Sequence, residues 1–215
     1  MVWEQQSPIN LRATVSADAP KDYLRLSWST AIDGFRRNGA HGVEVLFGVT
    51  PDKHLDLGGK RFHLRQFHFH HPSEHLCDGQ AFDAEVHLVH QNLDDLSLAV
   101  VGIFLSVEAS AKETKESSAL AESFLQAVKD SSTAIPLKPS WWLPDQRDRV
   151  FRYEGSLTTE PFTESVSWIV LPEPKAITAD LFTAIFGSHP QAARPIQAHN
   201  RRYILDLAVK IVLAK

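Results

Sequence analysis

The chain has 215 residues, 43% of them hydrophobic, and a formal net charge of −4. This length and composition fit one globular domain with a sizeable core, and the weakly acidic balance argues against nucleic acid as a partner, because phosphate binding needs a basic face. No apolar run reaches the length that spans a membrane, so we expect no membrane partner.

The first half of the sequence is typical of β-strands. Apolar and polar residues alternate at 23–28 and, more loosely, at 43–47. The pair Gly58–Gly59 predicts the turn of a hairpin whose second strand carries the segment QFHFHH. Further strands are expected at 82–92 and at 96–107, and the second of these is apolar enough to be buried on both faces.

An amphipathic helix is predicted over residues 112–130. Leu120, Phe124 and Val128 recur there every four residues and would form one apolar stripe on a helix. This segment is the main departure from the β pattern, so we expect it at the periphery of a mainly β domain.

The last part of the chain mixes both patterns. Residues 165–171 return to a strand, and residues 178–187 predict a short helix with Thr178 as its N-cap and Gly187 just past its end. The C-terminal segment at about 205–215 is expected to be a packed terminal helix or strand, with an extra docking element or an interface as the alternative. Because no linker is visible in the sequence, we expect residues 1–215 to form a single domain.

The histidines are concentrated in one region, since seven of the 11 lie between residues 63 and 90. On a strand, residues two apart share a face, so His68 and His70 point the same way. A neighbouring predicted strand carries His87. Three imidazoles that converge from two strands are a common ligand set for catalytic zinc, with water in the fourth position.

The alternative is that these are surface histidines or hydrogen-bonded core histidines. A lone histidine is more often one of these. Three buried imidazoles without a ligand would leave several polar nitrogens to satisfy, so the pattern favours a metal site.

Two polar residues support the metal interpretation. Gln66 lies two residues before His68, and Glu85 lies two before His87, each on the same strand face as its histidine. Metal-bound histidines usually give their second N–H to a carboxylate or carbonyl group. The alternative for both residues is ordinary strand polarity toward solvent.

A cupin metal site is the competing interpretation. In that motif Glu74 would be a ligand beside His68 and His70, and the metal is often iron. The motif expects a glycine where the chain has Ala81, and it expects its last histidine much further along the chain than His87. The cupin-like oxygenase is therefore the second choice.

The chain resembles the α-class carbonic anhydrases of the bacterial type. The resemblance rests on blocks in the family's order: QSPIN (6–10), QFHFHHPSEH (66–75), AEVHLVHQN (84–92), LAVVGIFL (98–105), YEGSLTTEPFTESVSWIVL (153–171) and a late RP…NR (194–201). It implies a large, mostly antiparallel twisted central sheet with a few peripheral short helices. It also implies reversible hydration of carbon dioxide to bicarbonate and a proton through a zinc-bound hydroxide.

The resemblance also assigns roles to individual residues. His68, His70 and His87 correspond to the zinc ligands, with Gln66 and Glu85 as their outer partners. Thr158 corresponds to the threonine that accepts a hydrogen bond from the zinc-bound hydroxide, and Glu74 to the carboxylate that accepts the threonine proton. The residues that correspond to the substrate pocket are Val89, Val100, Leu157, Thr159, Val166 and Trp168.

The proton shuttle is where the chain departs from the family pattern. Fast members carry a histidine directly after Asn-Gly, whereas Ala40 follows Asn38–Gly39 here and His41 comes one place later. His41 is the candidate shuttle, because its ordinary pKa suits proton transfer near neutral pH. A solvated loop histidine is the alternative.

The remaining expectations concern context. Cys77 is the single cysteine, which favours a cytoplasmic protein, with a periplasmic or secreted one as the alternative if a signal peptide has been removed. A homodimer is a candidate assembly. A carbonic-anhydrase-related binding module without catalysis is the alternative function, although such proteins lose zinc ligands that this chain retains.

Overall fold

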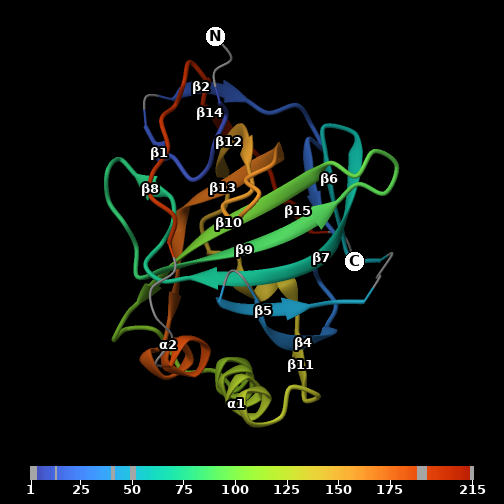
Figure 1. Ribbon diagram of the computed structural model, residues 1–215, viewed down its shortest axis with the longest axis vertical. Helices are drawn as coiled ribbons and strands as arrows, with labels where there is room; N and C mark the ends of the chain where they lie inside the picture. Colours follow the sequence, from blue (N-terminus) through green and yellow to red (C-terminus); the bar gives the residue numbers. More distant parts are fainter. Residues whose placement is uncertain (1–3, 13, 40–41, 49–51, 188–192, 214–215) are drawn as a thin grey trace.

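The structure is a computed structural model that describes residues 4–12, 14–39, 42–48, 52–187 and 193–213 (Figure 1). Thirteen strands of this part form one sheet. Its main path, in spatial order, is β11 (Ala134–Leu137), β4 (Ile32–Gly39), β5 (Gly42–Leu46), β7 (Lys60–His70), β9 (Ala84–Gln91), β10 (Leu98–Val107), β13 (Glu164–Ile177), β12 (Arg149–Ser156), β14 (Leu205–Ala208) and β2 (Val15–Asp18).

Three further strands branch from β7. They are β6 (His54–Leu57), β3 (Leu24–Leu26) and β15 (Val212–Leu213), and a separate two-stranded pair joins β1 (Asn10–Leu11) to β8 (Leu76–Cys77). The expected C-terminal segment is thus two short strands, of which β14 extends the main sheet and β15 pairs with β3. In the described residues no helix has the length and apolar character needed to cross a membrane.

The sheet is mixed, which refines the expected mostly antiparallel arrangement. Most neighbours are antiparallel, including the central pairs β5–β7, β7–β9 and β9–β10. However, β10 runs parallel to β13, and β2 runs parallel to β14. Parallel neighbours need a long crossover connection, and the segment between β10 and β13 supplies one, because it contains the long helix.

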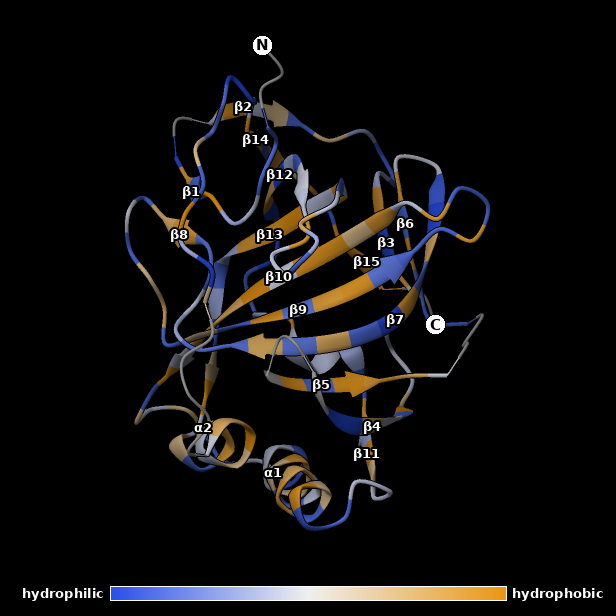
Figure 2. Ribbon diagram, viewed as in Figure 1, coloured by the Kyte–Doolittle hydropathy of each residue, from blue (hydrophilic) through white to orange (hydrophobic). Residues whose placement is uncertain are grey.

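The two faces of the sheet carry two hydrophobic clusters. The larger contains Phe67, Leu88 and Val101 and extends to α1 (Lys115–Lys129) and α2 (Ala179–Phe186), which lie side by side in Figure 1. The smaller lies on the opposite face and includes Val89, Val100 and Trp168. Strand β10 is therefore buried on both sides, as its continuous apolar sequence predicts, and Figure 2 shows its hydrophobic colouring along most of its length.

Both predicted helices form, with one correction in the first. Leu120 and Phe124 are buried, but Val128 is 55% exposed and Ala127 is buried instead. Steps of four residues advance by about 400° on a helix with 3.6 residues per turn, so a position eight residues on has drifted about 80° from the starting face. A position seven residues on returns to within about 20°, which places Ala127 under Leu120.

The second helix has the predicted boundaries. The Thr178 side chain accepts a hydrogen bond from the Leu181 backbone N–H, so it is the N-cap. Gly187 ends the helix with φ 51°, a conformation that glycine adopts without steric cost. The turn at Gly58–Gly59 between β6 and β7 likewise has both glycines at positive φ.

Candidate metal centre

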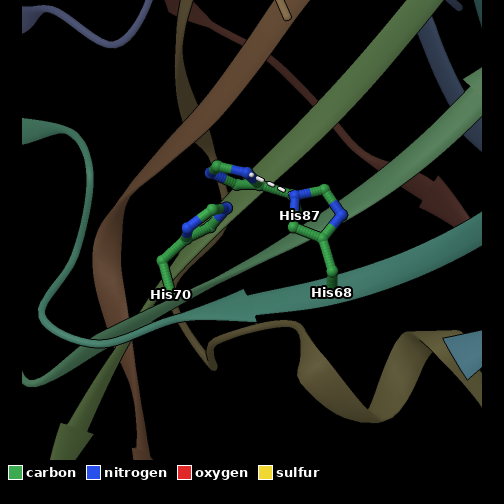
Figure 3. Close-up of side chains that lie close together, drawn as sticks. All are labelled: His68, His70 and His87. Carbon is green, nitrogen blue, oxygen red and sulfur yellow. Dashed lines mark hydrogen bonds between the residues drawn. The ribbon is translucent and has the colours of Figure 1, made fainter. Parts of the chain in front are cut away.

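Strand pairing brings the three histidines together. β7 and β9 are antiparallel neighbours, and His68 lies directly opposite His87 in their register. His70 lies two residues further along β7, on the same face. One potential ligand atom from each of the three lies within 4.8 Å of the others, and all three side chains are buried. Figure 3 shows the rings converging from the two strands.

Outer hydrogen bonds orient two of the rings. The Gln66 side-chain oxygen lies 2.9 Å from His68 Nδ1, and a Glu85 carboxylate oxygen lies 2.9 Å from His87 Nε2. The opposite nitrogens, His68 Nε2 and His87 Nδ1, therefore face each other, 3.2 Å apart. The structure thus brings Gln66 and Glu85 into contact with the histidines that the sequence pairs them with.

The donor set fits a zinc ion. A tetrahedral site with Zn–N bonds of about 2.0–2.1 Å places its ligand nitrogens about 3.3 Å apart, close to the observed separation. Burial lowers the pKa of His87, although Glu85 acts in the opposite direction, so its imidazole is available in the neutral form that binds metal. Imidazole ligands suit zinc better than they suit magnesium or calcium.

Glu74 reaches the same centre from the turn after β7. One of its carboxylate oxygens lies 3.2 Å from His70 Nε2, and the other accepts a hydrogen bond of 2.9 Å from the Arg194 backbone N–H. Burial raises the pKa of Glu74 to about 8, and hydrogen bonds from Arg194 and from the Thr158 hydroxyl act against that shift. A bound dication would favour the ionised carboxylate.

The apolar residues of the predicted pocket lie on the same face of the sheet. Val89 lies opposite Gln66 on β7 and opposite Val100 on β10, and Val100 in turn pairs with Trp168. The Trp168 ring stacks edge-on against His87, with centroids 4.8 Å apart. The smaller hydrophobic cluster contains these three residues and Val166, with Leu157 packed against it.

The two threonines lie just after β12, in its connection to β13. Thr158 is buried and hydrogen-bonds with Glu74, whereas Thr159 is half-buried and begins the turn that Phe162 closes. The structure thus places Thr158 beside the carboxylate that the sequence assigns to it. His41, the candidate shuttle, lies outside the described residues.

A buried chain of polar groups behind His87 is absent from the sequence predictions. Glu85 also lies 2.8 Å from His75 Nδ1, and His75 Nε2 lies 2.6 Å from the Tyr153 hydroxyl, which hydrogen-bonds Ser7 at 2.9 Å. Burial alone would raise the pKa of Glu85, but His75 and His87 hold it well below its ordinary value. Glu85 is therefore an anchored anion that fixes the ring of His87.

Sequence reasoning missed His75 because it follows Glu74 in a turn, where no strand or helix period applies. The available signal was its place in the cluster of seven histidines. Ser7 and Tyr153 are more than 100 residues from each other, so only the fold brings them together.

Gly102 is required for the position of Glu85. It lies opposite His87 in the β9–β10 register, and a Cβ atom there would come within 2.8 Å of a Glu85 carboxylate oxygen. We expect Gly102→Ala to displace the carboxylate and to weaken zinc binding about 10- to 100-fold, the usual cost of losing an outer partner. Competition with a chromophoric chelator measures this affinity.

Gly48→Ala is the matched control, because no heavy atom of the described residues lies within 4 Å of the position that a Cβ atom would take at Gly48. Circular dichroism checks that both variants remain folded. Equal zinc affinity in Gly102→Ala and in the control would contradict the role given to Glu85.

Comparisons with known proteins agree with this geometry. A sequence model of the eukaryotic-type carbonic anhydrase family matches residues 3–214. A carbonic anhydrase from Nostoc sp. is 34% identical over 209 residues, which cover 95% of this chain and 76% of that protein. The α-carbonic anhydrase from Thermovibrio ammonificans, solved with the inhibitor sulfanilamide, has a TM-score of 0.77 and 29% identity over 94% of this chain and 86% of that one.

The same fold also occurs in a protein that has been solved with a different kind of ligand. A crystal structure of dioscorin complexed with ascorbate has a TM-score of 0.79 and 29% identity, and covers 94% of this chain and 85% of that one. Fold alone does not determine function, so the activity of this chain depends on the side chains at the metal centre.

Proposed function

The chain belongs to the eukaryotic-type carbonic anhydrase family and catalyses the reversible hydration of carbon dioxide to bicarbonate and a proton; we propose that it does so with one zinc ion held by His68, His70 and His87. The observation that carries this proposal is the convergence of three buried imidazole nitrogens within 4.8 Å. The family match and the single large sheet set aside the cupin alternative, in which Glu74 is a metal ligand.

Zinc supplies Lewis-acid chemistry when bound, and in carbonic anhydrases, the standard example of this effect, it lowers the pKa of a bound water to about 7. Neutral imidazoles leave the charge of the ion undiminished. Glu85 and Gln66 hold two of the rings in orientation through hydrogen bonds of 2.9 Å, so the ligand nitrogens are positioned before the metal arrives.

Thr158 and Glu74 orient the nucleophile. The Thr158 hydroxyl donates its proton to the Glu74 carboxylate, which leaves the threonine oxygen to accept a hydrogen bond from the attacking oxygen. An acceptor fixed at that point directs the remaining lone pair of the attacking oxygen toward the apolar residues of the pocket. Orientation of this kind increases the reaction rate because the attacking oxygen has already lost its rotational freedom before the reaction. It does not require tight binding.

The apolar wall holds carbon dioxide. Val89, Val100 and Trp168 present hydrocarbon and aromatic surface next to His87. Carbon dioxide has no net dipole, so it loses little hydration free energy when it moves from water to such a surface. Bicarbonate is a charged product that the wall does not stabilise. The wall therefore admits the neutral substrate and favours release of the anion.

Removal of the metal tests this proposal. We expect hydration of carbon dioxide by the purified protein to fall to the uncatalysed rate after dialysis against a chelator, and to return when about one equivalent of zinc is added. Iron(II) should restore much less activity, because three imidazoles with an open position fit zinc. Hydration that survives complete metal removal, or that returns only with iron(II), would contradict the proposal.

Three expectations from the sequence remain predictions. They are cytoplasmic localisation, a homodimeric assembly and proton transfer by His41. Cell fractionation, analytical ultracentrifugation and the buffer dependence of a His41→Ala variant test them in turn.

A further inference from the structure

A β-bulge in β7 places two consecutive side chains on the face of the metal centre. Leu64 pairs with His90 and Gln66 pairs with the adjacent Val89, so Arg65 is the extra residue between them. Leu64 belongs to the large core on the opposite face, and alternation turns Arg65 away from that core. Gln66 faces the histidines, because it contacts His68, so Arg65 and Gln66 share one face.

The bulge fixes Arg65 close to the centre. Its backbone oxygen accepts a 3.1 Å hydrogen bond from the Phe47 N–H, which ties the bulge to the end of β5. Arg65 lies three residues before His68, about 10 Å along an extended strand. Its long side chain is half-buried. Arg65 directly precedes Gln66, which lies in register with Leu46 on β5 and Val89 on β9.

Among the described residues, Arg65 differs from the other arginines nearby in having no anionic partner. Arg61, four residues earlier on the same face of β7, pairs with Asp56 at 2.8 Å. Arg37 on β4 pairs with the buried Glu44, which lies opposite His68, at 2.7 Å. In the part of the chain that the structure describes, the Arg65 guanidinium forms neither a hydrogen bond nor an ion pair.

We propose that Arg65 binds the bicarbonate anion beside the metal centre, an inference that rests on the proposed function. A guanidinium keeps its positive charge and offers parallel N–H donors that match two oxygens of a planar oxyanion such as bicarbonate. Carbon dioxide carries no charge and gains little from this group. Arg65 is thus a specificity residue for bicarbonate, the anionic reactant. It lies next to the apolar wall, which suits carbon dioxide, the neutral reactant.

The reaction's equilibrium decides which measurement is informative. It fixes the ratio of kcat/KM in the two directions at a given pH, so no variant changes one of these values alone. The inhibition constant of bicarbonate against carbon dioxide hydration reports binding of the anion directly. The same bound state sets KM for bicarbonate in dehydration.

Arg65→Gln is expected to raise the inhibition constant of bicarbonate about fivefold to tenfold, the size of one partly solvated hydrogen bond to a charged group. Arg65→Lys keeps the charge but not the paired donors, so its value should lie between those of wild type and Arg65→Gln. Arg61→Gln is the matched control and should leave the inhibition constant at the wild-type value. Equal values for Arg65→Gln and wild type, or equal rises in both glutamine variants, would overturn the inference.

Equilibrium binding gives a second measurement without turnover. Calorimetric titration of the zinc-loaded protein compares neutral sulfanilamide with 4-carboxybenzenesulfonamide, which carries a carboxylate in place of the amine. Arg65→Gln should weaken only the carboxylated ligand, and equal weakening of both would overturn the inference. A wild-type protein that does not hydrate carbon dioxide overturns the proposed function, whereas an active wild type with unchanged anion binding in Arg65→Gln overturns this inference alone.

Discussion

Replacing His87 with alanine is expected to reduce zinc affinity by more than about 100-fold, beyond the loss that follows removal of an outer partner, and to abolish hydration at ordinary zinc concentrations. His87 is the only one of the three proposed ligands on β9, so the two that remain are neighbours on β7. The variant would also leave the buried Glu85 carboxylate without one of its two histidine partners. Metal analysis and a carbon dioxide hydration assay on the same sample measure both effects.

His63→Ala is the control for this variant. His63 lies on β7 and outside the cluster of three, so its removal should leave zinc content at about one per chain. Circular dichroism separates loss of metal from loss of fold. Retention of one zinc and of hydration in folded His87→Ala would contradict the assigned ligand set.

Replacing Thr158 with alanine is expected to lower kcat/KM for hydration about 100-fold while zinc content stays near one per chain. The change removes the hydroxyl that donates to Glu74 and accepts from the nucleophile, and loss of a single oriented hydrogen bond at a reacting centre costs about 100- to 1,000-fold. The lower end applies because the threonine orients a nucleophile and does not stabilise a full developing charge. Stopped-flow hydration with parallel metal analysis checks the result.

Thr158→Ser keeps the hydroxyl and should retain most of the activity, which separates the role of the oxygen from that of the methyl group. Thr163→Ala is an exposed control in the same connection between β12 and β13. Activity of Thr158→Ala within about threefold of wild type, with zinc bound, would show that the nucleophile does not depend on this hydroxyl.

Strand periodicity explains why much of the centre was predictable. The spacing of His68 and His70 places both on one face of any strand, and the same rule relates Gln66 to His68 and Glu85 to His87. The apolar residues between them, such as Phe67 and Leu88, identify the opposite face as core, and both are fully buried. Local pattern therefore indicates which way each side chain points before any pairing is known.

Pairing and turns explain what was not predictable. The register that sets His68 opposite His87 is a property of two strands together. Glu74 and Arg194 meet through a backbone hydrogen bond across 120 residues, and no period describes either segment. The bulge at Arg65 depends on one unpaired residue, which alternation of sequence alone does not locate.

The helix correction has a related cause. A stripe written in steps of four residues drifts around a helix, so Val128 leaves the buried face that Leu120 and Phe124 occupy. The parallel pairing of β10 with β13 likewise follows from the course of the chain between them, which includes α1. Sequence pattern defines elements and faces, and the connections between elements set their direction.

The most direct test of the zinc site is a crystal structure of the zinc-loaded protein with anomalous data on both sides of the zinc absorption edge. We expect one strong zinc peak about 2.0–2.1 Å from His68 Nε2, His70 Nε2 and His87 Nδ1, with Glu74 directed to Thr158. A peak coordinated by the Glu74 carboxylate, or one located away from these three nitrogens, would contradict this expectation.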